Sequence, residues 1–265
     1  MNIGICGAGG RMGNAILRIM IERGHKLHAA FDAEGSPLIN KNCRELVNSP
    51  LADCVITTIN MDSLKGIDGV IDFSAPPASM KLIKMLSQMK KPMVTGTTGF
   101  SEKDIDEIRS YSELMPVIQS PNMSLGVNLL FKLTEIASMA LSTDYDVEIF
   151  EAHHRFKKDA PSGTARRLLE IVKENMEGLS GAADINGRQG ITGERTRNEI
   201  GMHAMRGGNI IGEHTVFYTG PDDRLELTHR AASRDVFARG AVSAMEYLNN
   251  RAPGFYTMYD VLGFK

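Results

Sequence analysis

The sequence predicts an α/β protein with two domains: an N-terminal, doubly wound parallel sheet and a second domain that contains an antiparallel hairpin. In the first third of the chain, short apolar runs alternate with amphipathic helical stretches. That rhythm changes after Asn122, where alternating apolar and polar residues predict strands with one buried face. The length of 265 residues lies near the size at which one hydrophobic core tends to split into two.

The elements of the first domain follow from these patterns. Short, mainly apolar runs predict the strands Ile3–Cys6, Lys26–Phe31, Val70–Phe73, Pro92–Val94 and Met115–Gln119. Apolar positions at helical spacing predict the helices Arg11–Arg23, Met80–Met89 and Ser101–Tyr111. Strands that alternate with helices through short loops are typical of a parallel sheet covered on both faces.

The second domain is predicted to begin with a helix and to be rich in strands. Its expected elements are a helix Val127–Leu141, a strand Asp146–Ala152, a long loop Leu179–Glu199, and hairpin strands Ile210–Thr219 and Arg224–Ala231. A final helix is expected over Val236–Asn249, before a Pro-Gly segment.

Composition and charge exclude several classes of protein. An apolar share of 42% is ordinary for a folded domain, and a net charge of −2 without a basic run argues against nucleic-acid binding. The longest apolar segment, Leu125–Leu141, is interrupted by Asn128, Lys132 and Glu135, so no membrane span is expected.

Cysteine usage indicates a reducing compartment. Cys6, Cys43 and Cys54 are odd in number, widely spaced and without a C-x-x-C pair, which argues against a disulfide framework or a structural zinc site. The N-terminal residues show no secretory signal. We therefore expect a cytoplasmic protein.

Three glycines between the first strand and the first helix predict a dinucleotide site. Gly7, Gly10 and Gly13 form G-x-x-G-x-x-G, and a reading as G-x-G-x-x-G from Gly7 places Met12 in the third slot. Glycine lets a pyrophosphate approach the backbone N–H groups at the start of the helix. A tight turn without a ligand is the alternative, but the position between strand and helix favours the Rossmann-type phosphate loop.

The second strand ends at Asp32, about twenty residues beyond the glycines. An acidic side chain there binds the ribose hydroxyls and repels a 2′-phosphate. Ala33 follows, so no arginine serves NADP at that point, although Arg11 could approach a phosphate. We expect NADH to be preferred and NADPH to be possible, with a surface aspartate that binds nothing as the alternative.

Two further segments are expected to face the cofactor. Gly96-Thr97-Thr98-Gly99 and Ser120-Pro121-Asn122-Met123 each follow a predicted strand, at the carboxyl ends where open α/β sheets bind ligands. Both are small and polar and could offer backbone groups to a nicotinamide ring. Either could equally be an ordinary strand-to-helix turn.

The segment Glu151–Thr164 carries the densest functional pattern. His153, His154, Arg155 and Lys157 would form a basic pocket for an anionic substrate, and histidine and lysine can deliver protons. The alternative is a capped helix that follows a solvated basic turn.

The start of the helix that follows can bind a carboxylate. Pro161-Ser162-Gly163-Thr164 is typical of a helix start, where free N–H groups bind anions.

A shared metal ion is not expected in this segment. Adjacent residues on a strand point to opposite faces, so His153 and His154 are poorly placed to ligate one ion. His203, His214 and His229 occur singly along the chain.

Together these segments resemble the dihydrodipicolinate reductase (4-hydroxy-tetrahydrodipicolinate reductase) family. The run E-A-H-H-R…K…D-A-P-S-G-T is specific to that family, and the likeness includes Thr192-Gly193-Glu194-Arg195 and Gly212-Glu213-His214-Thr215.

The resemblance implies a fold and an activity. The fold is a Rossmann-type domain of residues 1–124, completed by 234–265, and an α+β domain of residues 125–233 with a mixed, open sheet that binds substrate and forms a homotetramer. The activity is reduction of the small cyclic dicarboxylate imine by NAD(P)H in diaminopimelate and lysine biosynthesis, without a metal.

The resemblance also implies roles for single residues. His153 corresponds to the acid/base histidine, Lys157 to the proton-donating lysine, and His154, Gly163 and Thr164 to contacts of the substrate carboxylate. The cofactor contacts are Gly7, Ala8, Gly9, Gly10, Arg11, Met12, Asp32, Gly96, Thr97, Thr98, Ser120, Pro121, Asn122 and Met123. Two departures are Ala33, where some members are basic, and Phe156, where many have histidine.

Two other functions remain open at this point. An aspartate-semialdehyde or homoserine dehydrogenase would share the two-domain plan, but the former needs a nucleophilic cysteine in the substrate domain, and all three cysteines precede residue 55. A dinucleotide-sensing regulator would have little need for a histidine, a lysine and an anion-binding helix start in one segment.

Overall fold

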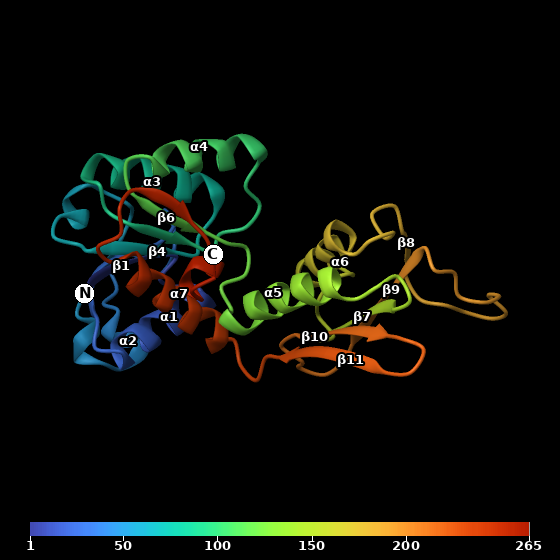
Figure 1. Ribbon diagram of the computed structural model, residues 1–265. Coiled ribbons are helices and arrows are strands. Elements are labelled where there is room, and N and C mark those ends of the chain that lie inside the picture. The colour runs from blue at the N-terminus through green and yellow to red at the C-terminus, as the bar shows by residue number, and fades with distance from the viewer. Residues whose placement is uncertain (265) are drawn as a thin grey trace. The chain divides into compact units, whose positions relative to one another are not determined.

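The computed structural model describes residues 1–264, which divide into two compact units. The first unit consists of Met1–Leu125 together with the chain from Arg234 onward, and the second of Gly126–Ser233. Each unit has its own sheet (Figure 1). No helix in residues 1–264 has both the length and the apolar character needed to cross a membrane.

The sheet of the first unit has seven strands in the order β12-β6-β5-β4-β1-β2-β3, and all neighbours are parallel. The strands are β1 (Asn2–Cys6), β2 (Lys26–Phe31), β3 (Ile56–Thr57), β4 (Gly69–Asp72), β5 (Met93–Thr95), β6 (Pro116–Gln119) and β12 (Gly254–Tyr256). The central strands are buried on both faces, which explains their continuous apolar runs. The doubly wound parallel sheet predicted from the sequence is confirmed.

Helices cover both faces of this sheet, as Figure 1 shows. The helices are α1 (Arg11–Glu22), α2 (Arg44–Val47), α3 (Pro76–Met89), α4 (Glu102–Ser112), α7 (Asp235–Leu248) and α8 (Met258–Val261). One core cluster joins α1 and α7 to β1, and another joins α3 and α4 to the opposite face. The C-terminal α7 thus packs beside α1, more than 200 residues earlier in the chain.

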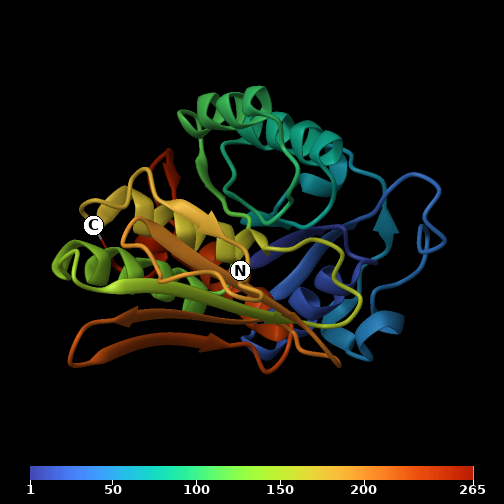
Figure 2. The same ribbon diagram turned by 90° about the vertical axis from the view of Figure 1, so that its right-hand side faces the viewer.

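The second unit has a mixed sheet of five strands in the order β11-β10-β7-β9-β8. These are β7 (Asp146–His153), β8 (Ala183–Ile185), β9 (Glu199–Arg206), β10 (Glu213–Thr219) and β11 (Arg224–Arg230). Two helices, α5 (Leu125–Ala140) and α6 (Gly163–Asn175), lie on one face, and the β10–β11 hairpin lies at the edge (Figures 1 and 2). The antiparallel pairing of this hairpin confirms the prediction from its alternating residues.

The predicted loop Leu179–Glu199 is wrong in part, because β8 lies inside it and β9 begins at its end. Both strands pair in parallel, β8 with β9 and β9 with β7. β8 has only three residues and none of them is buried, so it leaves no apolar pattern. Its place depends on its neighbour in the sheet rather than on its own sequence.

Candidate active site

The centre of the candidate site lies at the end of β7. Glu151 and His153 are two residues apart on one strand, so their side chains lie on the same face. A carboxylate oxygen of Glu151 lies 2.5 Å from Nδ1 of His153. His153 is largely but not fully buried, with 12% of its side chain exposed, so it remains accessible from solvent.

Glu151 is fully buried and has three sets of donors. Besides His153, the guanidinium of Arg206 on β9 donates to both carboxylate oxygens, at 2.7 and 2.9 Å, and the backbone N–H of Ser162 donates at 3.2 Å. Burial by itself raises the pKa of this carboxyl, but the hydrogen bonds from His153 and Arg206 lower the pKa to about 2. Glu151 is therefore an anion at neutral pH.

His214 on β10 lies beside His153, although the sequence showed it only as a single histidine. The two rings meet edge to face, with centroids 5.2 Å apart, and Nε2 of His214 lies 3.1 Å from the Ser162 hydroxyl. Burial, followed by the charge of His153, lowers the pKa of His214 to about 3, so this ring is neutral. The register that pairs His214 with Glu151 brings it here, and that register depends on long-range strand pairing.

Glu151, His153 and His214 offer ligand atoms within 4.8 Å of one another. This trio differs from the adjacent pair His153 and His154 that the sequence drew attention to. Arg206 already engages both oxygens of Glu151, which makes the trio part of an ion-pair network rather than a set of open ligands.

The other basic residues of the segment follow β7 in a loop. Lys157 forms an ion pair with Asp159, with both carboxylate oxygens 2.8 Å from its Nζ. The ring of His154 lies 6.2 Å from that of Phe156, which is strongly exposed. His153 ends β7 and Lys157 follows in the next loop, both in the second unit; their roles in catalysis stay predictions.

Helix α6 begins at Gly163, directly after the segment Ala160-Pro161-Ser162. Ser162 is the N-cap residue, and its hydroxyl accepts a hydrogen bond from the N–H of Ala165. Gly163 and Thr164 form the first turn, and no atom lies within 4 Å of a Cβ built on Gly163. The N-terminus of a 13-residue helix, with open space beside it, suits a carboxylate.

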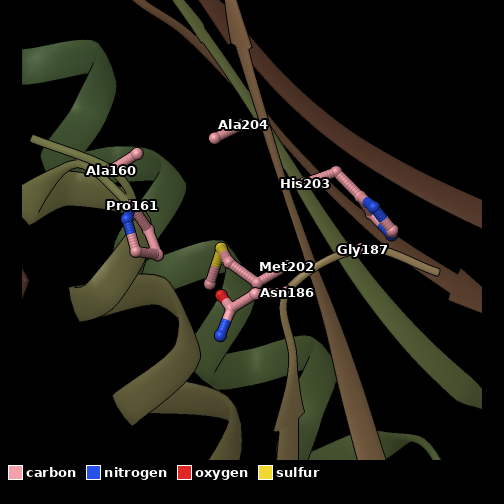
Figure 3. A pocket seen from close by; sticks show the side chains of 7 residues that line it. All are labelled: Ala160, Pro161, Asn186, Gly187, Met202, His203 and Ala204. Carbon is pink, nitrogen blue, oxygen red and sulfur yellow. The ribbon is translucent and has the colours of Figure 1, made fainter. Parts of the chain in front are cut away.

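A cavity of about 470 Å³ lies beside this helix start. Figure 3 shows Ala160 and Pro161 on one side of it and His203 on the other, with Met202 and Asn186 between them. The cavity is bordered by the part of β9 that extends beyond the short strand β8.

The glycine loop of the first unit has a backbone geometry that requires glycine at its first position. Gly7 has a φ of +79°, and a Cβ at this position would lie 2.4 Å from the carbonyl oxygen of Phe73. A cavity of about 260 Å³ opens at the carboxyl ends of β1, β2 and β4. It is lined by Cys6, Gly7, Gly10, Asp32, Ala33, Ile59, Phe73, Ser74, Ala75 and Ala78. These residues fit a bound nicotinamide dinucleotide.

Asp32 lies at the border of this cavity and also holds the glycine loop. Its carboxylate accepts hydrogen bonds from the N–H of Gly9 at 3.1 Å, the N–H of Ala33 at 2.8 Å and the hydroxyl of Ser36 at 3.2 Å. The side chain is therefore fixed in place before any ribose arrives.

The two segments predicted to face the nicotinamide are tied to the sheet by polar contacts. The fully buried carboxylate of Asp72, at the end of β4, accepts hydrogen bonds from Ser74, Ser79, Thr95 and Thr97. This cage, which the sequence analysis missed, fixes the start of Gly96–Gly99 to β4.

The segment Ser120–Met123 is held by the hydroxyl of Ser120. That hydroxyl donates to the carbonyl of Asn122 at 2.8 Å, and the N–H of Ser120 donates to the carbonyl of Thr95 at 3.1 Å. The contacts of these predicted residues with a cofactor remain predictions.

Comparison with known proteins identifies the family. The family pattern described as dihydrodipicolinate reductase, N-terminus, matches residues 1–123, and the pattern for the C-terminus of that enzyme matches residues 126–262. This chain belongs to the dihydrodipicolinate reductase family. The resemblance stated from the sequence motifs is therefore confirmed, and membership of a family of reductases supports the prediction of an oxidoreductase.

Individual relatives agree over the whole chain. Proteins named 4-hydroxy-tetrahydrodipicolinate reductase from Syntrophus aciditrophicus (strain SB) and Aquifex aeolicus (strain VF5) are 43% and 44% identical, over 98% of this chain and 98% and 97% of their own lengths. The solved dihydrodipicolinate reductase of Paenisporosarcina sp. TG-14 has a similar fold, with a TM-score of 0.78, 22% identity and 98% coverage of both chains.

The alternative enzyme class, aspartate-semialdehyde dehydrogenase, is similar to this chain in fold alone. Aspartate semialdehyde dehydrogenase II from Vibrio cholerae has a TM-score of 0.56 at 12% identity, with 93% of this chain and 97% of that chain covered. Cys6, Cys43 and Cys54 all lie in the first unit, so the second unit contains no thiol nucleophile.

Proposed function

We propose that this protein reduces 4-hydroxy-tetrahydrodipicolinate to tetrahydrodipicolinate with NAD(P)H, in the biosynthesis of diaminopimelate and lysine. The observation that carries the proposal is the match of both halves of the chain to one reductase family, together with a buried Glu151–His153–Arg206 network at the end of β7. The first unit binds the cofactor and the second binds the substrate.

His153 and Lys157 exchange protons with the substrate in this proposal. When bound, a reduced nicotinamide supplies a hydride to the conjugated imine. The carbanionic character that results must be quenched by a proton, and His153, with a buried carboxylate on its other nitrogen, is placed to donate one. Lys157 supplies positive charge or a second proton.

The N-terminus of α6 holds a carboxylate of the substrate. Gly163 and Thr164 present backbone N–H groups there, and His154 in the preceding loop adds a donor. A dicarboxylate gains charge-assisted hydrogen bonds at this point without a metal.

NADH is the preferred cofactor and NADPH a possible one in our proposal. Asp32 is preorganised by Gly9 and Ser36, and its negative charge repels a 2′-phosphate. Ala33 supplies no compensating positive charge. Arg11, at the start of α1, remains the one cation of the loop that could approach a phosphate.

A homotetramer, assembled through the second unit, is part of the proposal. Exposed apolar side chains follow one face of α5 at helical spacing, namely Leu129, Leu133, Ile136 and Met139. Light scattering coupled to size-exclusion chromatography tests this assembly. We place the protein in the cytoplasm, because its three cysteines are free thiols.

A coupled assay tests the reaction. The unstable substrate is generated in place from pyruvate and aspartate semialdehyde, and loss of nicotinamide absorbance is followed with NADH and NADPH side by side. Turnover that collapses in Lys157→Ala, while binding of NADH persists, supports the proposal. Wild-type protein that binds NADH but shows no turnover with either cofactor would contradict it and favour a dinucleotide sensor.

A further inference from the structure

The carboxylate of Glu151 is an acceptor for every group that surrounds it. Arg206 and the backbone N–H of Ser162 can only donate, and both point at this carboxylate. Because Glu151 is ionised, the 2.5 Å contact with Nδ1 of His153 requires a hydrogen atom on that nitrogen. The proton of a neutral His153 therefore lies on Nδ1, and Nε2 carries the lone pair.

We propose that Glu151 is a positioning residue that fixes His153 as its Nδ1–H tautomer, so that Nε2 is the atom that exchanges the proton with the substrate. Arg206 balances the buried charge and holds the carboxylate in the plane that His153 requires. The proton that reaches the substrate leaves Nε2 of the imidazolium, and the ring returns to the neutral Nδ1–H form. The role of Nε2 in turnover rests on the proposed function, whereas the tautomer itself does not.

The surroundings of His153 contain the groups that affect its protonation. These are Glu151 on β7, Arg206 on β9, His214 on β10, Lys157 with Asp159 in the following loop, and His229 beyond His214 on β11. Of these, only Glu151 forms a hydrogen bond with a ring nitrogen of His153 within residues 1–264. The tautomer is thus set by one partner.

A glutamine at position 151 reverses the hydrogen bond. Its single oxygen takes the place of Oε1, which receives Ser162 and one N–H of Arg206. The amide NH₂ then takes the place of Oε2, where it faces Nδ1 of His153 and the second N–H of Arg206 loses its acceptor. The ring must then accept at Nδ1 and carry its proton on Nε2. We expect kcat to fall by at least about 10-fold, with an unchanged KM for NADH. The alkaline limb of the kcat profile moves to lower pH, because the imidazolium has lost the negative charge beside it.

The chain offers a matched control on the same strand. Glu148, on the opposite face of β7, accepts from Nε2 of His203 at 2.6 Å and from Arg188 and Arg195. Glu148→Gln removes the same charge from the same kind of cluster on the opposite face of β7, where the histidine that Glu148 holds is His203 and not His153. It should affect stability, but not the pH profile of kcat.

Nitrogen-15 NMR of the full-length protein, labelled at histidine, reads the tautomer directly. The signals of His153 are assigned from their loss in His153→Gln. We expect Nδ1–H in the wild type and Nε2–H in Glu151→Gln, with the kinetic changes confined to Glu151→Gln. The proposal is overturned if neutral His153 of the wild type carries its proton on Nε2, or if Glu151→Gln and Glu148→Gln have the same kcat profile.

The wild-type spectrum needs only the assignment variant His153→Gln, so a misfolded Glu151→Gln protein would not leave the inference untested. Failure of the proposed function is separate, because it shows as absent turnover in the wild type whatever the tautomer.

Discussion

Gly212 gives a direct test of access to Nε2 of His153. A Cβ built on Gly212 lies 3.1 Å from that nitrogen, at least 0.3 Å closer than the 3.4 Å at which ordinary contacts begin. Gly212 has no positive φ, so alanine is tolerated by the backbone. The substitution Gly212→Ala therefore moves the imidazole and does little else.

The size of the effect follows from that displacement. His153 is held at Nδ1 by Glu151, so its ring must turn or slide by a few tenths of an ångström. Since a misplacement of about 1 Å costs about 100-fold in rate, a displacement of about 0.3 Å corresponds to roughly a 4-fold loss of kcat. The KM for NADH should not change, because the cofactor site belongs to the other unit.

Gly181→Ala is the matched control. No atom lies within 4 Å of a Cβ at Gly181, and this glycine also has no positive φ. Both substitutions restrict the unfolded chain in the same way, which changes the free energy of unfolding by about 0.4–1 kcal/mol. The coupled assay and thermal unfolding are measured for both variants. An unchanged kcat in Gly212→Ala, or an equal loss in Gly181→Ala, would refute the reasoning.

Three further predictions concern stability. Tyr218→Phe removes a fully buried hydroxyl that forms hydrogen bonds with Ser138 and the carbonyl of Thr134. Urea unfolding should show a loss of about 1–3 kcal/mol in the free energy of unfolding, and a loss below the error of the fit would contradict this prediction. Ser101→Ala breaks the capping box at the start of α4 and should cost about 1 kcal/mol in the same measurement, whereas Ser110→Ala on the same helix should cost less. Burial raises the pKa of Glu148, but its arginine and histidine partners lower the pKa to about 2. The contribution of Glu148 to stability is therefore present above the usual glutamate pKa and is lost as the pH falls towards 2. Acid unfolding should be less steep in Glu148→Gln, and an acid limb identical to that of the wild type would count against the ion-pair network.

The parallel sheet could be predicted from the sequence because its signals are local. β2 has the bounds that were expected. β1, β4 and β5 differ by one or two residues, since each is a short apolar run buried on both faces. α7 was predicted as a helix, and the resemblance assigned the C-terminal segment to the first domain; its packing against α1 was not predicted. β8 and β9 were missed because their pairing partners are distant in the chain.

The candidate site could likewise be predicted only where its residues are adjacent in the sequence. His153, Lys157 and the start of α6 follow one another in the sequence, so a single segment revealed them. Asp72 and its four hydroxyl donors are spread over 25 residues and look like ordinary strand ends and turns. Only the parallel register of β4 and β5 brings Asp72 opposite Thr95.

The two glutamates of β7 show why the sequence could not choose the partners of His153. Glu148 and Glu151 are three residues apart, so they lie on opposite faces of the strand, and each meets a histidine and an arginine. His203 reaches Glu148 from β9, and Arg206, three residues later on the same strand, reaches Glu151. A shift of β9 by one residue would exchange these faces and leave both carboxylates without their partners. The register of β7 and β9 is therefore what joins Glu151 to His153 and Arg206 on one face and Glu148 to His203 on the other.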